Sequence, residues 1–599
     1  MRRSYILCIA GACAVSLIAA SPQRLVGDGR EYLAQALNFA SLHGPPLRPR
    51  DLGEIQLEMA RFDPTLASWN IRDATVADSR RNLDFQHFWF YALLAAPGVW
   101  LTRLLDLPPT LAFTGLNLVF IGLALWTAIP RIGSAASVLL FASPIIWWID
   151  KAHTEVFTFS LLVVAFALIE ERPWWSMIAA GAAATQNPPI AAVLLFIWLA
   201  AVSRDRSAVV DRRVATGALL GLALALLHPI YTFVHHQSPS LLLSATRRGL
   251  PSLASVTAVI TDPAIGLIGN FPVFLIVVLA ALAWRGPAAN AATAPPAAWR
   301  RRNAAVAAGA AVVFFISFAR TTNVHHGGTP GMSRYAIWLI PLAVPLLAGM
   351  QEVRNHGWRR FLWAAAIASA TISVAAFRPS VPQNSREPTA LASFLWTRLP
   401  SLNNPLPEVF SETELHLDDL WVPAATAGCE KVLLGVTPDA GAWPIPCYPA
   451  PVPEMCQPAG TLCYANRTKN GYRFAHAPGE AAGKLRSDAV WPVDAAPHVR
   501  RIYEAWDWPT LDFDTTKPGP VQEAAGVSAV ALGSADRFVV VLRDVRPAAV
   551  LRLQPARQRR GVLVDALTGR TVADEECAEN RACTIPLPEG FTILLLAMR

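Results

Sequence analysis

The chain has 599 residues, of which 53% are apolar and only 16% are charged, against a usual charged share of about 25%. Water alone would not tolerate this much apolar surface, so the composition excludes an ordinary soluble domain. The formal net charge of +8 does not indicate nucleic-acid binding. Most of the surplus lies in short loops between apolar segments, where Lys and Arg mark the cytoplasmic side of a membrane protein.

Long apolar runs recur through the first 380 residues and then stop. The sequence therefore predicts an α-helical polytopic membrane domain over 1–380, with about 11 spanning helices and a long outside loop at 22–85. A linker is predicted over 381–430. A mostly β, sandwich-like domain containing cysteines is predicted over 431–599, outside the cytoplasm.

The N-terminus, Met1-Arg2-Arg3 followed by an apolar run to Ala20, fits either a signal peptide or an uncleaved first helix. Both interpretations place residue 22 onward outside the cytoplasm. We favour the uncleaved helix, because the chain that follows returns to the membrane repeatedly.

Arginine-rich loops set the topology of the second half of the membrane domain. The loops at 203–213, 285–302 and 354–360 should be cytoplasmic. The helices between and after them then alternate correctly and leave the C-terminal domain outside. These helices are predicted at about 214–234, 264–284, 303–319, 334–350 and 359–377.

Six apolar stretches lie between the outside loop at 22–85 and the cytoplasmic loop at 203–213. An odd number of crossings must join these two loops, so one stretch is not a full crossing. The weakest is 133–149, which is short for a spanning helix and contains Pro144. If this stretch is re-entrant, the cluster 150–155 emerges outside. The alternative is one helix over 174–203, but Thr185-Gln186-Asn187-Pro188-Pro189 reads as a turn and favours the first solution. The six stretches are about 86–105, 109–128, 133–149, 152–170, 174–186 and 188–203.

This pattern resembles the GT-C superfamily of polytopic glycosyltransferases, which includes protein O-mannosyltransferases and aminoarabinose transferases. Asp28, Tyr32 and Ala36 follow the first helix, and a long outside loop comes next. An aromatic, Pro-bearing segment then starts at Phe88-Trp89-Phe90-Tyr91, and Ser143-Pro144 precedes the acidic cluster. The sequence departs from the family in Gly27-Asp28-Gly29, which has Gly where many relatives carry a second acid, and at Gln186-Asn187, which replaces the usual Lys or Arg near Thr185.

The resemblance implies transfer of a sugar from a polyprenyl-phosphate carrier to a glycan, lipid or protein acceptor at the membrane boundary. Such a reaction needs a carboxylate to take the acceptor's proton and cations to bear the phosphate's charge. Asp28 is the candidate base, and Glu31, one helical turn on, is its candidate helper. The competing interpretation is that Asp28 only caps the helix that starts near Arg30.

Arginines of the outside loops are candidates for the phosphate, because the guanidinium fork matches phosphate oxygens. Arg334 is the strongest of them, since it stands at a helix entrance. Asp150, His153 and Glu155 are candidates for holding a sugar or a divalent ion, although no cofactor is predicted and a metal lacks support. The candidate substrate-binding residues are Asp150, His153, Glu155, Arg247, Arg248, Arg320, His325, His326, Arg334 and Tyr335.

Six of the eight cysteines lie beyond residue 428, which predicts disulfides in an oxidising compartment rather than a zinc site. Cys577 and Cys583 are close enough in sequence to close one small loop. Tyr503 to Trp508 offers aromatic faces to a sugar or simply forms core. Strands are predicted at Lys431–Val436, Phe538–Arg543, Val550–Leu553, Gly561–Leu567 and Thr592–Met598.

The sequence thus predicts a multi-pass glycosyltransferase of a bacterial inner membrane whose C-terminal domain lies in the periplasm. One alternative is a non-catalytic membrane protein that binds or escorts a surface glycan. A transporter is favoured less, because few charged groups sit at the middle of a helix.

Overall fold

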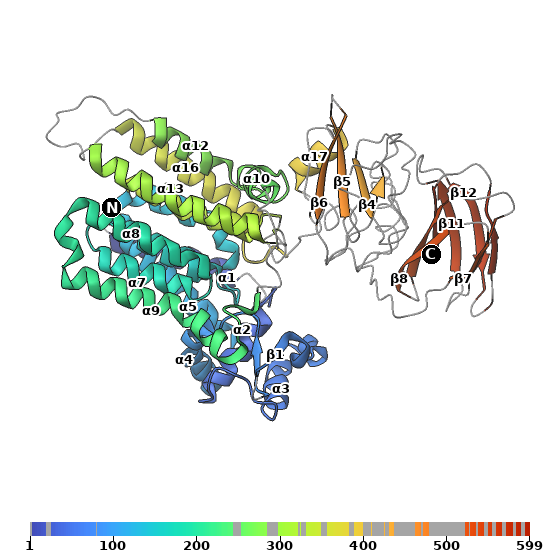
Figure 1. The fold of residues 1–599 in the computed structure, drawn as a ribbon, viewed down its shortest axis with the longest axis horizontal. Helices are drawn as coiled ribbons and strands as arrows, with labels where there is room; N and C mark the ends of the chain where they lie inside the picture. The colour runs from blue at the N-terminus through green and yellow to red at the C-terminus, as the bar shows by residue number, and fades with distance from the viewer. Residues whose placement is uncertain are drawn as a thin grey trace. The chain divides into compact units, whose positions relative to one another are not determined.

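The structure is a computed structural model of the whole chain (Figure 1). It divides into two compact units, Met1–Thr261 with Ile265–Asn384, and Asp262–Ala264 with Ser385–Arg599. The residues that the structure describes are 3–19, 25–78, 81–242, 253–283, 297–321, 324, 331–348, 356–382, 389–398, 409, 424–425, 431–435, 462–468, 471–477, 521–525, 528–534, 537–543, 549–553, 559–565, 571–578, 581, 583–588 and 593–598.

The first unit is built mainly from apolar helices. Among the described residues, four helices are long and apolar enough to cross a membrane: Thr110–Phe141, Arg212–His236, Arg301–Arg320 and His356–Phe377. Together with the composition, they identify a membrane protein. Its helices are α1 (Arg3–Ala19), α5 (Thr110–Phe141), α6 (Glu155–Leu168), α7 (Pro173–Ala184), α8 (Ala191–Arg204), α9 (Arg212–His236), α10 (Leu253–Thr261), α11 (Leu267–Asn270), α12 (Pro272–Ala283), α13 (Ala297–Arg320), α14 (Arg334–Ile337), α15 (Val344–Ala348) and α16 (His356–Phe377), with short 3-10 turns between some of them.

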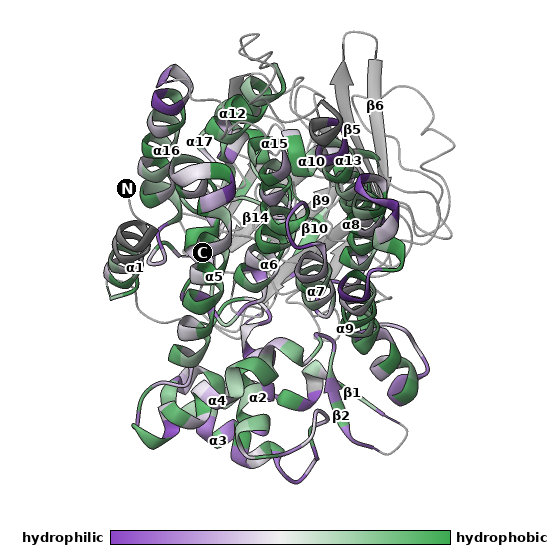
Figure 2. Ribbon diagram, turned by 90° about the vertical axis from the view of Figure 1, so that its left-hand side faces the viewer, coloured by the Kyte–Doolittle hydropathy of each residue, from purple (hydrophilic) through white to green (hydrophobic). Residues whose placement is uncertain are grey.

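A smaller group of elements lies at one end of this bundle (Figure 2). It comes from the segment that follows α1 and includes a two-stranded antiparallel hairpin. Helix α2 starts at Gly29, and ten of its twelve residues are buried, as expected of a short helix packed within a domain. The elements of this group are α2 (Gly29–Ala40), α3 (Leu52–Phe62), β1 (Thr75–Ala77), β2 (Leu83–Phe85) and α4 (Phe90–Leu104).

Helix α4 belongs to this group, which does not support the predicted crossing at 86–105. At its start, Tyr91 packs edge-on against Tyr32 of α2, and near its end Arg103 donates a hydrogen bond of 3.2 Å to the carbonyl of Leu37. Helices α2 and α4 therefore run in the same direction. With 15 residues, α4 is about 22 Å long, which is short of the roughly 30 Å hydrocarbon core.

Helix α5 bends sharply at Gly133, whose φ of 82° is costly for residues with a Cβ. Just before the bend Arg131 pairs with Glu171, which follows α6. After the bend the chain runs back toward the first half of α5 and passes through the 3-10 turn Pro144–Trp148. There the amide of Asn117 in α5 donates a hydrogen bond of 3.0 Å to the carbonyl of Lys151. The stretch 133–149 therefore runs back along the length of α6, which favours a full crossing over the predicted re-entrant segment.

Small residues let α7 and α9 approach each other closely. A Cβ built on Gly181 of α7 would lie 2.1 Å from the carbonyl oxygen of Gly221 in α9. One turn away, a Cβ on Gly217 would lie 2.5 Å from the Cα of Trp174. Glycines four residues apart on an apolar helix are typical of close helix packing in membranes. The predicted turn at Thr185–Pro189 is confirmed, because α7 ends at Ala184 and α8 begins at Ala191.

The second unit contains the short helix α17 (Ala390–Arg398) and antiparallel strands in three sheets, ordered β3-β4-β5-β6, β13-β10-β7 and β12-β11-β14-β9-β8. All five predicted strands are present, with bounds that differ by a few residues. The structure has a strand, and not a helix or a loop, at each of these five segments. The strands are β3 (Ala424–Ala425), β4 (Lys431–Gly435), β5 (Leu462–Thr468), β6 (Gly471–Ala477), β7 (Val521–Ala525), β8 (Ser528–Ser534), β9 (Arg537–Arg543), β10 (Val550–Leu553), β11 (Arg559–Asp565), β12 (Thr571–Cys577), β13 (Cys583–Pro586) and β14 (Ile593–Met598).

A disulfide joins Cys577 at the end of β12 to Cys583 at the start of β13, with Cα atoms 5.4 Å apart. This confirms the predicted small loop. The predicted aromatic segment 503–508 lies outside the described residues, so its proposed contact with sugars stays a prediction.

Candidate active site

Asp28 stands at the N-cap position of α2, but its side chain makes no capping hydrogen bond. Its Oδ2 instead accepts a hydrogen bond of 2.9 Å from Nη1 of Arg334. The same oxygen lies 3.1 Å from Nε2 of His87 and 3.3 Å from Nε2 of His153. The interpretation of Asp28 as a simple helix cap is therefore wrong, because the carboxylate is directed at three basic side chains.

His87 was missed by the sequence analysis. It lies between two carboxylates, with Nε2 toward Asp28 and Nδ1 2.9 Å from Oε2 of Glu31. Its backbone is held in turn, since the buried amide of Gln35 donates to the His87 carbonyl at 2.9 Å. A lone His has no periodic signal. The one available hint was its position directly before the aromatic run that starts at Phe88.

His153 and Glu155 form the buried side of the site, with side chains 1% and 2% exposed. One carboxylate oxygen of Glu155 accepts a hydrogen bond of 2.6 Å from the indole of Trp338, and the other lies 3.6 Å from Nδ1 of His153. The side chains of Asp28 and Arg334 are 20% and 18% exposed. The cluster therefore has a sealed side and an accessible side.

Charges of the neighbours set the protonation of Asp28 and His87. Burial alone would raise the pKa of Asp28, but the charge of His87, the hydrogen bond with His153 and the charge of Arg334 hold it well below 3.8. Burial alone would lower the pKa of His87, but Asp28 and Glu31 outweigh it and raise this pKa above 6.5. Both shifts therefore favour the charged forms, a carboxylate at Asp28 and an imidazolium at His87.

Aromatic rings fix the positions of these side chains. The buried ring of Tyr32 lies 5.9 Å from the ring of His87 and 6.0 Å from that of His153, measured between centroids. Burial, followed by the charge of Asp28, raises the pKa of Tyr32 well above 10 and keeps its hydroxyl protonated. Its neighbour Tyr91 donates a hydrogen bond of 2.8 Å to Asn117, whose amide holds the carbonyls just before His153.

Asp150 is separated from this cluster by its own partner. Its fully buried carboxylate pairs with the fully buried ammonium of Lys151, which also donates to the carbonyl of Pro379 at 3.0 Å. Trp147 donates to the carbonyl of Val381 at 2.8 Å. These hydrogen bonds connect the turn that carries His153 to the residues directly after α16.

The remaining predicted residues divide into three groups. The Tyr335 ring lies 5.5 Å from the guanidinium carbon of Arg334 and packs against Trp338, so it lines the cluster. Arg320 is the exposed last residue of α13 and is not among the described side chains that contact Asp28. The four others lie outside the described residues: Arg247, Arg248, His325 and His326.

One ligand atom from each of Asp28, Glu31 and His87 lies within 4.8 Å of the others, which is close enough to hold a metal ion. The hydrogen bonding fits a metal poorly, however. Both ring nitrogens of His87 face carboxylates and need protons to bond them, whereas a metal ligand must offer a lone pair. Arg334 also donates to Oδ2 of Asp28, the oxygen that faces His87.

No protein-family model matches the chain, and no curated protein matches it. Among solved structures, the crystal structure of ArnT from Cupriavidus metallidurans in the apo state matches 61% of this chain and 62% of its own, with 18% sequence identity and a TM-score of 0.35. The chain thus spans less than two thirds of that protein. A likeness of this size carries no argument about function.

Proposed function

We propose that this protein is a membrane glycosyltransferase of the GT-C type that moves a sugar from a polyprenyl-phosphate carrier to an acceptor outside the cytoplasm. The observation that carries the proposal is the position of Asp28. An ionised carboxylate is held by Arg334, His87 and His153, which come from three other parts of the chain, and it remains partly accessible.

Asp28 is the general base in this proposal. Within the described residues, its side-chain contacts are made at Oδ2, so Oδ1 is available to an acceptor hydroxyl. The acceptor's O–H bond breaks, its proton passes to Asp28, and the acceptor oxygen forms a bond to the anomeric carbon of the sugar. Glu31 acts indirectly, since it is hydrogen-bonded to the imidazole of His87, and Glu155 places a second carboxylate 3.6 Å from Nδ1 of His153.

Arg334 is the partner of the leaving group. As the bond from the anomeric carbon to the phosphate oxygen breaks, its electron pair stays on the polyprenyl phosphate, and a guanidinium suits the charge that develops there. A donor phosphate would compete with Asp28 for Arg334. This exchange would weaken the contact that lowers the pKa of Asp28 and would make the carboxylate a stronger base at the moment of reaction.

The location of the cluster also suits a lipid-borne donor. Asp28 follows α1 by a few residues, and Arg334 opens the apolar segment Arg334–Ala348. Polar groups at the ends of apolar helices lie near the headgroup region, where a carrier with its tail in the bilayer would present its phosphate. Asp150 then positions the turn before His153 rather than contacting a substrate.

The test is transfer by purified full-length protein in nanodiscs, supplied with hexosyl and pentosyl polyprenyl phosphates and a mixture of envelope acceptors. Release of free polyprenyl phosphate is measured for the wild type, for Asp28→Asn and for the control Asp106→Asn, whose exposed carboxylate pairs with Arg61. We expect Asp28→Asn to lower turnover by about 10²–10⁴-fold and the control to match the wild type.

Full turnover by a folded Asp28→Asn protein would overturn the assignment of the base. If the wild type binds envelope glycans but releases no polyprenyl phosphate from any donor, the non-catalytic alternative is correct instead.

A further inference from the structure

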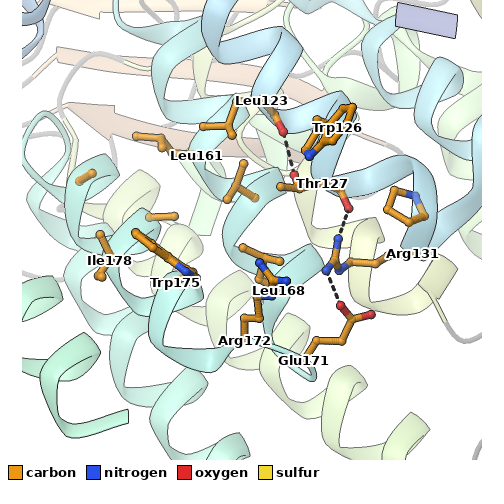
Figure 3. A pocket seen from close by; sticks show the side chains of 14 residues that line it. Leu123, Trp126, Thr127, Arg131, Leu161, Leu168, Glu171, Arg172, Trp175 and Ile178 are labelled. Atoms are coloured by element: carbon orange, nitrogen blue, oxygen red, sulfur yellow. Dashed lines mark hydrogen bonds and ion pairs between the residues drawn. The ribbon is translucent and has the colours of Figure 1, made fainter. Parts of the chain in front are cut away.

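A cavity lies between α5, α6 and α7, with a volume of about 680 Å³ (Figure 3). Sites for small ligands and cofactors commonly measure about 300–1,000 Å³. One end of it is formed by Arg131, Glu171 and Arg172, near the end of α6. Since Glu155 opens α6 and the helix has 14 residues, this end lies about 20 Å from the candidate active site.

The walls of the cavity are apolar. Leu123 and Trp126 of α5, Leu161 of α6 and Trp175 and Ile178 of α7 line it (Figure 3). The side of the cavity is open, because Trp126 and Trp175 are 54% and 51% exposed in the isolated chain. Along an apolar helix bundle the surrounding medium is lipid, so a hydrocarbon chain is the ligand that such walls fit.

The polar end of the cavity carries an unshared positive charge. Arg131 donates to the carbonyl of Thr127 at 2.7 Å and pairs with Glu171. Arg172 is exposed and has no ion pair with any described residue. Two guanidinium groups therefore face one carboxylate, and the end of the cavity complements a single anionic group.

We propose that this cavity binds an anionic glycerophospholipid of the surrounding bilayer, with an acyl chain against the apolar walls and the headgroup phosphate at Arg172. The same end of the bundle carries other arginines, including Arg204 and Arg302 around Glu170, as expected of a cytoplasmic face. The cytoplasmic leaflet is the one whose anionic lipids attract such groups. The site is independent of the proposed transfer reaction.

The headgroup contact is tested by native mass spectrometry of the full-length protein in detergent, titrated with phosphatidylglycerol or with phosphatidylcholine of the same acyl chains. We expect phosphatidylglycerol to bind more tightly. Arg172→Gln should weaken its binding about fivefold, the usual value of one Arg near anionic lipid, and leave phosphatidylcholine binding unchanged. The matched control is Arg206→Gln, an exposed arginine near the same end of the bundle that does not line the cavity.

The acyl-chain contact is tested by Ala179→Trp, which places an indole in the cavity, with Leu219→Trp on the exposed face of α9 as control. Ala179→Trp should weaken binding of both lipids, and the control should not. The proposal fails if Arg172→Gln behaves like Arg206→Gln, or if Ala179→Trp leaves phosphatidylglycerol binding intact. Stronger binding of a polyprenyl phosphate than of phosphatidylglycerol, lost in both variants, would overturn the assignment to a glycerophospholipid.

Discussion

Arg334 donates a hydrogen bond of 2.9 Å to Asp28 from 306 residues further along the chain. Both side chains are about four-fifths buried, and the guanidinium Nη1 also lies 3.4 Å from Nε2 of His153. The contact joins the first loop after α1 to the entrance of α14. A change at either residue should therefore affect both the site and the packing of these two segments.

Arg334→Gln should lower turnover by about 10²–10³-fold, as removal of one preorganised donor to a developing oxyanion commonly does. It should also lower the stability of the folded protein, because the largely buried carboxylate of Asp28 loses one of its cationic partners. Turnover and thermal unfolding of purified protein measure the two effects. The control is Arg50→Gln, an exposed arginine near Asp51. Unchanged turnover in Arg334→Gln would remove this residue from the proposed mechanism.

The charge on His87 should set the alkaline limit of activity. Its pKa is raised above 6.5, so in the folded protein it keeps its proton to a higher pH than a free imidazole and loses it as the pH rises through the raised value. The stability that it contributes is thus complete below 6.5 and disappears above the raised pKa. The contribution of Asp28, whose pKa is lowered, is present above 3.8 and disappears only at more acidic pH.

The matching experiment compares the pH dependence of turnover in the wild type, in His87→Gln and in the control His43→Gln. We expect His87→Gln to lower turnover and to lose the alkaline limb, while His43→Gln retains it. An alkaline limb that is identical in His87→Gln would assign the titration to another group.

Asn117→Ala should destabilise the turn that carries His153. Asn117 accepts from Tyr91 and donates toward the carbonyls of Trp148, Ile149 and Lys151, all of them buried. Leaving such groups without partners costs about 1–3 kcal/mol, and thermal unfolding in detergent should detect this. Tyr91→Phe removes one hydrogen bond and should cost only about 1 kcal/mol. Equal effects of the two variants would contradict the role assigned to the Asn117 amide.

Gly181→Ala should disrupt the contact between α7 and α9, because the new methyl group would meet the backbone of Gly221. Overpacking of this kind costs about 1–3 kcal/mol. Gly122 in α5 is the control, since nothing lies within 4 Å of a Cβ built there. Gly122→Ala should be neutral or slightly stabilising, and equal unfolding temperatures for the two variants would contradict the close packing.

A chelator should leave turnover unchanged if His87 bridges Asp28 and Glu31 as an imidazolium. The measurement is polyprenyl-phosphate release before and after treatment with EDTA, followed by addition of Mg²⁺, Mn²⁺ or Zn²⁺. Loss of turnover that one of these ions restores, and that His87→Gln abolishes, would identify the cluster of Asp28, Glu31 and His87 as a metal site.

Local composition predicted much of this protein correctly. The length of the apolar runs identified a helical membrane unit. Alternating runs with turn residues identified five of the strands that the structure describes in the second unit. The spacing of Cys577 and Cys583 indicated their disulfide. His153, Glu155 and Arg334 were also selected from sequence, because ionisable groups next to apolar helices stand out against their surroundings. Asp28 was selected by its place after the first helix together with the resemblance to the GT-C superfamily. Their roles in transfer stay predictions.

The sequence by itself determined which segments are apolar and which side chains could carry chemistry. Only the tertiary structure decided where each apolar stretch packs and which groups meet. Helix α4 is as apolar as a crossing helix, but its partners α2 and α5 hold it at one end of the bundle. His87 likewise joins the site through contacts with Asp28 and Glu31, 56 residues or more away. Hydropathy is a property of each residue, whereas depth and neighbours are set by packing between distant segments.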